Sequence, residues 1–285
     1  MEEFQLHLPN MNLTVAGFRC GKVDAPKLLA MHGWLDNAAS FTSLAPYFES
    51  YDFYAIDFPG HGKSSHFPKS QAYQIFDYVR FGVSFIKEMG WESVYLLGHS
   101  LGASIALLMS AVLPKHVQGL CLVESLGPLT AVEQECASQY IKYIEQSLKK
   151  EKTDLSIYSS VSQAAKARAT YSNVNQDSAE ILAKRGTNEK DGTYTWCSDP
   201  RLRLASPQPL TEEQLESFLQ RVKTQILLIV AHEGWVFDKY LVDKRASQLK
   251  NISRTHLPGS HHLHMEIPKE VASVIHKSGI FSIPG

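Results

Sequence analysis

Short apolar runs alternate with helical patterns along most of this chain, and few folds accommodate that order. Each run has the length of a strand, and most of the runs end at a glycine, a histidine or an acidic residue. Strands that are apolar throughout and separated by helices are typical of a parallel sheet covered on both faces. The predicted strands are 28–31, 51–56, 93–97, 117–123, 226–230 and 253–257, and the predicted helices are 73–89, 101–113 and 238–249.

The segment before the first of these strands has a different pattern. Residues 4–18 alternate between apolar and polar side chains and carry Pro9-Asn10 at their centre. Alternation on both sides of a turn predicts an antiparallel hairpin, which we place at the edge of the sheet.

The alternation breaks after Glu124. Residues 126–220 contain no convincing buried strand, but two stretches, 130–133 and 211–214, have the spacing of helix capping boxes. The polar stretch 186–200 has no regular pattern and is predicted to be an irregular loop. We therefore interpret this part of the chain as a mostly helical insertion.

The insertion also accounts for the length of the chain. A chain of 285 residues is long for one plain α/β domain and short for two full domains. We predict an α/β core made of residues 1–125 and 221–285, with residues 126–220 forming a helical cap over it.

Composition limits the class of function. The chain has 28 Lys+Arg against 29 Asp+Glu, and this balance argues against a nucleic-acid partner. No apolar stretch is long enough to span a membrane. The four cysteines form no CxxC pair, so we expect free thiols, and together with an acidic start that lacks an apolar signal region this predicts a cytoplasmic protein.

The strongest chemical signal is Gly98-His99-Ser100-Leu101-Gly102, a G-x-S-x-G stretch between a predicted strand and a predicted helix. A turn this sharp requires a strained backbone at the serine, and glycine on either side removes Cβ atoms that would clash. The serine hydroxyl is then presented above the carboxyl edge of the sheet. We predict that Ser100 is a nucleophile.

A serine hydroxyl needs a base to take its proton. The histidine-rich stretch 260–268 follows the last predicted strand and a Pro-Gly turn, so it can reach the serine from the same edge of the sheet. Position alone leaves His261, His262 and His264 as candidates.

Three signatures now give a resemblance: His32-Gly33-Trp34, the stretch 57–64 (DFPGHGKS) and the turn at Ser100. The chain resembles α/β-hydrolase-fold serine hydrolases over nearly its whole length, and is most similar to the serine hydrolase-like (Kraken-like) proteins. That resemblance implies an α/β-hydrolase fold with a mostly parallel sheet. Relatives place the catalytic histidine seven residues before a proline, which implies His261 as the base, although Ser260 stands where they usually have glycine.

The same resemblance leaves more than one position for the acid. Many relatives carry an aspartate after the strand that follows the cap, and this chain has Gly234 there. Other members carry the acid at the end of the strand before the cap, which implies Glu124. Glu233 and Asp238 stay as alternatives. Whichever carboxylate fills the role would orient the imidazole and stabilise its charged form.

Backbone amides are expected to complete the site. The amide of Leu101 follows the nucleophile, and the resemblance implies that the amide of Trp34 is the second oxyanion donor. We also assign Trp34 and His99 to the substrate-binding site. No metal-ligand spacing and no phosphate-binding loop occur, so we expect neither a metal nor a cofactor.

We therefore predict a serine hydrolase that cleaves a small, apolar carboxylic ester. Two further kinds of interpretation stay open. The same residues could serve a monoacylglycerol lipase, a C–C hydrolase, an aminopeptidase or an acyltransferase, because one fold hosts many reactions. The scaffold could also be a non-catalytic binding protein. The oligomeric state is not predicted.

Overall fold

The computed structural model describes residues 1–149, 156–172, 174–234 and 239–282. Its main sheet has eight strands in the order β1-β2-β4-β3-β5-β6-β9-β10. The six strands from β4 to β10 in that order run parallel, whereas β1 and β2 form the antiparallel edge hairpin that the sequence predicts. The strands are β1 (Glu2–Leu8), β2 (Leu13–Gly21), β3 (Lys27–Met31), β4 (Asp52–Ile56), β5 (Val94–His99), β6 (Val117–Val123), β9 (Ile226–Glu233) and β10 (Ile252–Ser260).

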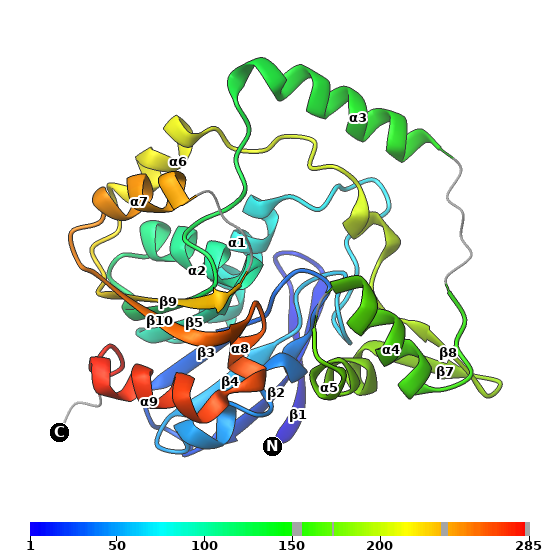
Figure 1. Ribbon diagram of the computed structural model, residues 1–285, viewed down its shortest axis with the longest axis horizontal. Helices are drawn as coiled ribbons and strands as arrows, with labels where there is room; N and C mark the ends of the chain where they lie inside the picture. The colour runs from blue at the N-terminus through cyan, green and yellow to red at the C-terminus, as the bar shows by residue number, and fades with distance from the viewer. Residues whose placement is uncertain (150–155, 173, 235–238, 283–285) are drawn as a thin grey trace.

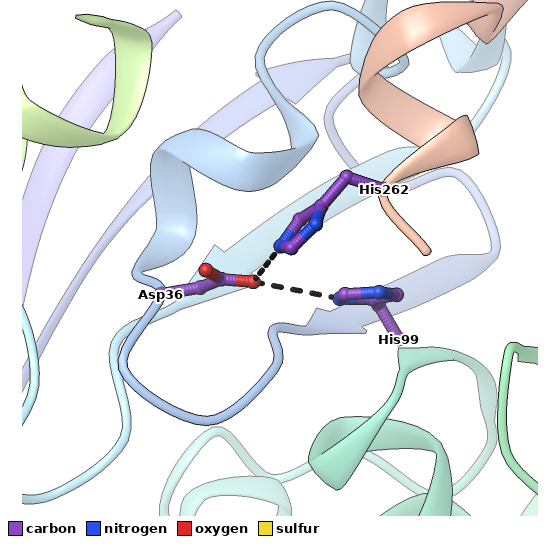
Figure 2. Close-up of side chains that lie close together, drawn as sticks. All are labelled: Asp36, His99 and His262. Atoms are coloured by element: carbon purple, nitrogen blue, oxygen red, sulfur yellow. Dashed lines mark hydrogen bonds and ion pairs between the residues drawn. The ribbon is translucent and has the colours of Figure 1, made fainter. Parts of the chain in front are cut away.

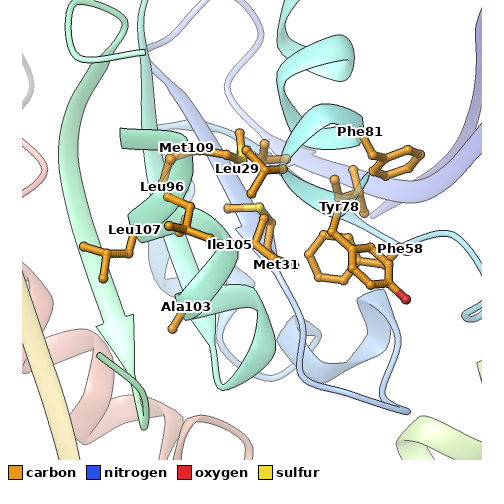
Figure 3. Packing of buried hydrophobic residues seen from close by; sticks show 14 of the residues in the cluster. Leu29, Met31, Phe58, Tyr78, Phe81, Leu96, Ala103, Ile105, Leu107 and Met109 are labelled. Carbon is orange, nitrogen blue, oxygen red and sulfur yellow. The ribbon is translucent and has the colours of Figure 1, made fainter. Parts of the chain in front are cut away.

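Helices cover both faces of this sheet, as predicted (Figure 1). Successive residues of β3 point to opposite faces: Leu29 and Met31 join the hydrophobic cluster that includes α1 and α2, whereas Leu28 and Ala30 join the cluster that includes α9. Figure 3 shows the first of these clusters between the sheet and the two helices. The helices flanking the sheet are α1 (Ile75–Glu88), α2 (Leu101–Val112), α6 (Glu212–Leu219), α7 (Lys239–Ser247), α8 (Leu263–Glu266) and α9 (Pro268–Ser278), with the 3-10 turns η1 (Ala38–Phe41) and η2 (Ala45–Phe48).

The described elements between β6 and α6 project from the sheet, with α3 at their outer end (Figure 1). In α3 none of the side chains is buried, whereas α4 and α5 pack against each other. The hairpin β7–β8 replaces the irregular loop predicted at 186–200, so that prediction was wrong. The elements are η3 (Glu133–Glu135), α3 (Cys136–Leu148), α4 (Val161–Ser172), α5 (Gln176–Gly186), β7 (Thr187–Lys190), β8 (Thr193–Trp196) and η4 (Pro200–Arg203).

The two predicted capping boxes have different outcomes. Thr211 and Gln214 form both reciprocal hydrogen bonds of the motif at the start of α6. Thr130 instead donates its hydroxyl to Glu212, and Val132 occupies the N-cap of η3. Helix α6 contributes Leu215 and Leu219 to the cluster that contains α2. The chain therefore returns to cover the sheet before residue 220.

Two buried ion pairs fasten the α4–α5 pair to the core. Arg185 of α5 donates from Nη2 to Asp57 at 2.9 Å, and the Asp57 side chain is fully buried. Arg168 of α4 donates to Asp36 at 2.7 Å, again with a buried carboxylate. Asp57 also accepts backbone hydrogen bonds from Ala38 and Lys63, so it joins two loops of the core to the projecting segment.

We predict that Arg185→Met lowers the free energy of unfolding by about 3–5 kcal/mol, because it leaves the Asp57 carboxylate buried without its guanidinium. The control is Arg254→Met, which breaks an ion pair of partly exposed side chains with Asp243 and should cost at most about 1 kcal/mol. Urea denaturation followed by circular dichroism measures both. Equal losses in the two variants would contradict the structural role of the buried pair.

Candidate active site

Ser100 lies in a sharp turn between β5 and α2. Its backbone has φ 52° and ψ −113°, which is a strained conformation for a residue with a side chain. The turn is held by a hydrogen bond of 2.9 Å from the Ser100 amide to the carbonyl of Val123, the last residue of β6. The serine therefore has a fixed backbone at the carboxyl edge of the sheet.

Glycine is required on both sides of this turn. A Cβ atom at Gly98 would lie 2.5 Å from the backbone of Ala103, and one at Gly102 would lie 2.0 Å from the carbonyl oxygen of Met31. Both contacts are with backbone atoms that cannot move aside. The sequence prediction that these glycines relieve clashes around Ser100 is confirmed.

His261 connects two of the predicted residues. Its Nε2 lies 2.9 Å from the Ser100 hydroxyl oxygen, and its Nδ1 lies 3.0 Å from a carboxylate oxygen of Glu124. A carboxylate only accepts hydrogen bonds, so Nδ1 carries the proton and Nε2 is left to accept from the serine hydroxyl. This tautomer has its lone pair directed at Ser100.

Glu124 follows β6 with φ 61° and its side chain is buried. One of its oxygens accepts from the amide of Ala231 at 2.5 Å, and the other faces His261. A Cβ atom at Gly234 would lie 2.1 Å from that second oxygen. The glycine at the position where many relatives have an aspartate therefore provides the space that Glu124 occupies.

The other acid candidates lie elsewhere. Glu233 ends β9 with an exposed side chain and pairs through its backbone with Ser260. Asp238 lies outside the described residues. Among the described carboxylates, the structure brings Glu124 to the imidazole of His261.

The neighbouring histidines have separate partners. His262 directs Nε2 to a carboxylate oxygen of Asp36 at 3.2 Å, and His264 directs Nε2 to the Ser40 hydroxyl at 2.6 Å. Both side chains are buried. The loop prediction needs one correction: β10 continues to Ser260, and the Pro258–Gly259 stretch is an irregularity within the strand, not a turn after it.

The two amides expected to bind an oxyanion belong to segments that meet at the start of α2. Leu101 is the first residue of α2, so its amide has no partner within the helix. The tight contact of Gly102 with the carbonyls of Met31 and His32 brings the start of α2 against the segment that leads to Trp34. Within the described ranges, neither the Leu101 nor the Trp34 amide has a hydrogen-bond acceptor.

The Trp34 ring links the core to the projecting segment. It is 40% exposed, and its Nε1 donates to the carbonyl of Leu202 at 3.0 Å. Leu202 in turn lines a cavity of about 350 Å³ between α3, the loop before α1 and residues 200–207. The lining is mixed: Tyr73, Tyr143, Leu202 and Leu204 contribute alongside Lys69, Gln146 and Arg201.

His99 does not face this cavity. Its side chain is 1% exposed, and its Nε2 donates to the backbone carbonyl of His261 at 2.8 Å. Its ring packs on that of His264 with centroids 4.2 Å apart. The structure therefore places His99 behind the His261 loop, and we correct its assignment as a substrate contact.

Asp36 is the residue that sequence analysis missed. Figure 2 shows its carboxylate between the rings of His99 and His262, two residues that lie far from it in sequence. These three side chains could also hold a metal ion, since their ligand atoms lie within 4.8 Å of one another. Arg168 already pairs with the same carboxylate, and its positive charge opposes a second cation there.

The chain matches known proteins over most of its length. Residues 26–267 match the family described as alpha/beta hydrolase fold. A probable serine hydrolase of Drosophila melanogaster is 30% identical over 284 residues, covering 95% of this chain and 85% of that protein. A serine hydrolase-like protein of Danio rerio is 28% identical over 261 residues, covering 87% and 79%.

Two solved structures are also similar to this chain. A hypothetical protein from Pseudomonas aeruginosa PAO1 is 31% identical, with a TM-score of 0.90 and 98% of each chain covered. A thioesterase domain from the curacin biosynthetic pathway has a TM-score of 0.84 at 24% identity, with 97% and 99% covered, and shows the fold alone. The chain belongs to the alpha/beta hydrolase fold family. Within it, the chain is similar to the serine hydrolase-like proteins, which confirms both the predicted fold class and the predicted resemblance.

No described helix is both long enough and apolar enough to cross a bilayer.

The pKa of His261 lies below its ordinary value of 6.5, because burial penalises the charged imidazolium more than the hydrogen bond to Glu124 favours it. The neutral form, with a lone pair on Nε2, therefore predominates at pH 7. We predict that NMR titration of the His261 ring gives a pKa below 6.5 and that Glu124→Gln lowers it further. A pKa above 6.5 in the unmodified protein would contradict this account.

Proposed function

We propose that the protein is a serine hydrolase that cleaves small carboxylic esters through an acyl-enzyme on Ser100. The observation that carries the proposal is the pair of hydrogen bonds made by His261, at 2.9 Å to Ser100 and 3.0 Å to Glu124. A nucleophile, a base and a group that orients the base are thereby joined in one chain of contacts, as acyl transfer requires.

In the first half of the reaction, the Ser100 oxygen attacks the ester carbonyl carbon while His261 Nε2 takes the hydroxyl proton. Glu124 stabilises the imidazolium that forms. The carbonyl oxygen becomes negatively charged and accepts hydrogen bonds from the amides of Trp34 and Leu101, of which one donor is worth about 3 kcal/mol. The carbon–oxygen bond of the ester then breaks, and His261 gives its proton to the departing alkoxide.

In the second half, water attacks the acyl-enzyme. His261, now neutral, takes a proton from the water as the bond to the carbonyl carbon forms. Collapse of the tetrahedral intermediate breaks the bond to the Ser100 oxygen, which regains a proton from His261. The products are an alcohol and a carboxylic acid, and the enzyme returns to its initial state.

The cavity beside Leu202 supports a small-molecule substrate. The Trp34 ring donates a hydrogen bond to the carbonyl of Leu202, which lines this cavity, and the Tyr143, Leu202 and Leu204 side chains of the lining offer apolar contacts. We propose that the apolar part of the substrate lies here, with Trp34 as a further contact. Residues 126–220 would then act as a lid. The buried bonds of Arg168 and Arg185 to the core support a fixed α4–α5 half of that lid.

We propose that the protein acts in the cytoplasm. All four cysteines are unpaired, and Cys121 is fully buried as a core thiol. Free thiols persist in a reducing compartment.

The central prediction concerns Ser100→Ala. Loss of the nucleophile should lower kcat for a p-nitrophenyl ester by roughly 10⁶-fold, the size seen when a serine nucleophile is removed elsewhere. The variant should also lose covalent labelling by a fluorophosphonate probe while keeping its circular dichroism spectrum. A series of acyl chain lengths on the unmodified protein then maps the pocket. Absence of labelling in the unmodified protein would favour a non-catalytic binding protein instead.

A matched pair of variants tests the acid. We predict that Glu124→Gln lowers kcat by about 10⁴-fold, as amide replacement of a triad acid does elsewhere, because the amide no longer fixes the His261 tautomer. Glu233→Gln removes a charge of the same sign from an exposed side chain at the same sheet edge and should change kcat little. Steady-state kinetics on one ester measures both. The reverse order of effects would refute the role of Glu124.

A further inference from the structure

Asp36 lies at a junction between the projecting segment and the candidate active site. Its side chain is buried, and one carboxylate oxygen accepts from Arg168 of α4 at 2.7 Å. The other oxygen faces His262 Nε2 at 3.2 Å and His99 Nδ1 at 3.5 Å (Figure 2). A Cβ atom at Gly33 would lie 2.9 Å from both that oxygen and His99 Nδ1, so the approach of the two groups depends on glycine there.

Both histidines that face Asp36 are attached to His261. The Nε2 of His99 lies 2.8 Å from the His261 carbonyl oxygen, and because a carbonyl only accepts, this nitrogen carries the proton. His262 is the next residue in the chain. Asp36 therefore bears on His261 through His262, the adjoining residue, whereas the His99 ring lies between the Asp36 carboxylate and the His261 peptide group.

Asp36 has a second role, which comes from its charge. Burial lowers the pKa of His99, so the ring is neutral and its Nδ1 has a bare lone pair that faces the carboxylate. Burial raises the pKa of Asp36, but the interactions with His262 and Arg168 outweigh it and hold the pKa well below its ordinary value. A full negative charge is thus held beside the His261 loop.

We propose that Asp36 is a positioning residue for His261, acting through His262 to fix the loop that carries the imidazole and adding a second buried negative charge behind it. The inference rests on the proposed role of His261 as base. The carboxylate lies in the interior, where charge interactions are screened less than in water, so it favours the imidazolium that forms during catalysis. The titratable and charged groups around His261 in the described part of the chain are Asp36, His99, Glu124, Arg168, His262 and His264.

The first test compares Asp36→Asn with Asp52→Asn. Asp52 is also buried and paired with a guanidinium, that of Arg19, but it starts β4 and so lies at the opposite edge of the sheet. We expect Asp36→Asn to lower kcat by roughly 10- to 100-fold, the range seen when groups that support catalytic residues are removed, with KM little changed. It should also lower the His261 pKa, because the charge favouring imidazolium is lost. Asp52→Asn should change neither quantity.

The second test should shift the His261 pKa in the opposite direction. Arg168→Met removes the positive charge that lies beside the other oxygen of Asp36. The negative charge of the carboxylate then acts more strongly on His261, and the His261 pKa should rise. This variant keeps Asp36 and its two histidine contacts, and it decides the proposal if Asp36→Asn does not fold. Both the pH dependence of kcat and NMR titration of the His261 ring measure the shift.

The outcomes separate this inference from the proposed function. Opposite shifts of the His261 pKa in the two variants, with Asp52→Asn unchanged, support the inference. Asp36→Asn behaving like Asp52→Asn in both kcat and His261 pKa would overturn it, as would an Arg168→Met variant whose pKa does not rise. An unmodified protein with no ester turnover and no probe labelling would refute the proposed function, and the NMR titrations would still decide how Asp36 acts on His261.

Discussion

The hydrogen bonds of His261 depend on how the chain leaves the carboxyl edge of the sheet. Non-glycine residues with positive φ follow three neighbouring strands: Leu35 after β3, Ser100 after β5 and Glu124 after β6. Such conformations cost about 1–3 kcal/mol each, and they persist only where surrounding packing fixes them. The apolar clusters on both faces of the sheet provide that packing, so the core stabilises the strained edge on which the site is built.

The regular part of the fold could be predicted because its signals are local. Each buried strand is an apolar run, and the edge hairpin alternates around a turn. The projecting segment was harder, because the apolar residues of α3 follow helical spacing and yet none of them is buried. The hairpin β7–β8 did have a usable signal in Asp191-Gly192, both with positive φ, which is the residue pair that two-residue hairpin loops prefer.

The candidate site likewise contains residues that the sequence predicts and residues that it does not. Ser100 is defined by its immediate neighbours, and the resemblance pointed to His261 and Glu124. Asp36 could not be found this way, because its contacts come from residues 99, 168 and 262, and their approach depends on the packing of four different segments. His99 shows the opposite error: its position beside the serine suggested a substrate contact, whereas alternation along β5 turns its ring into the interior.

Gly234 and Glu124 compete for one volume. Any residue larger than glycine at 234 would place a Cβ atom 2.1 Å from the Glu124 carboxylate, so an acid cannot be added at 234 while the glutamate keeps its present position. A designer who wishes to place a carboxylate at 234 must therefore change both positions, because the Glu124 side chain would have to move.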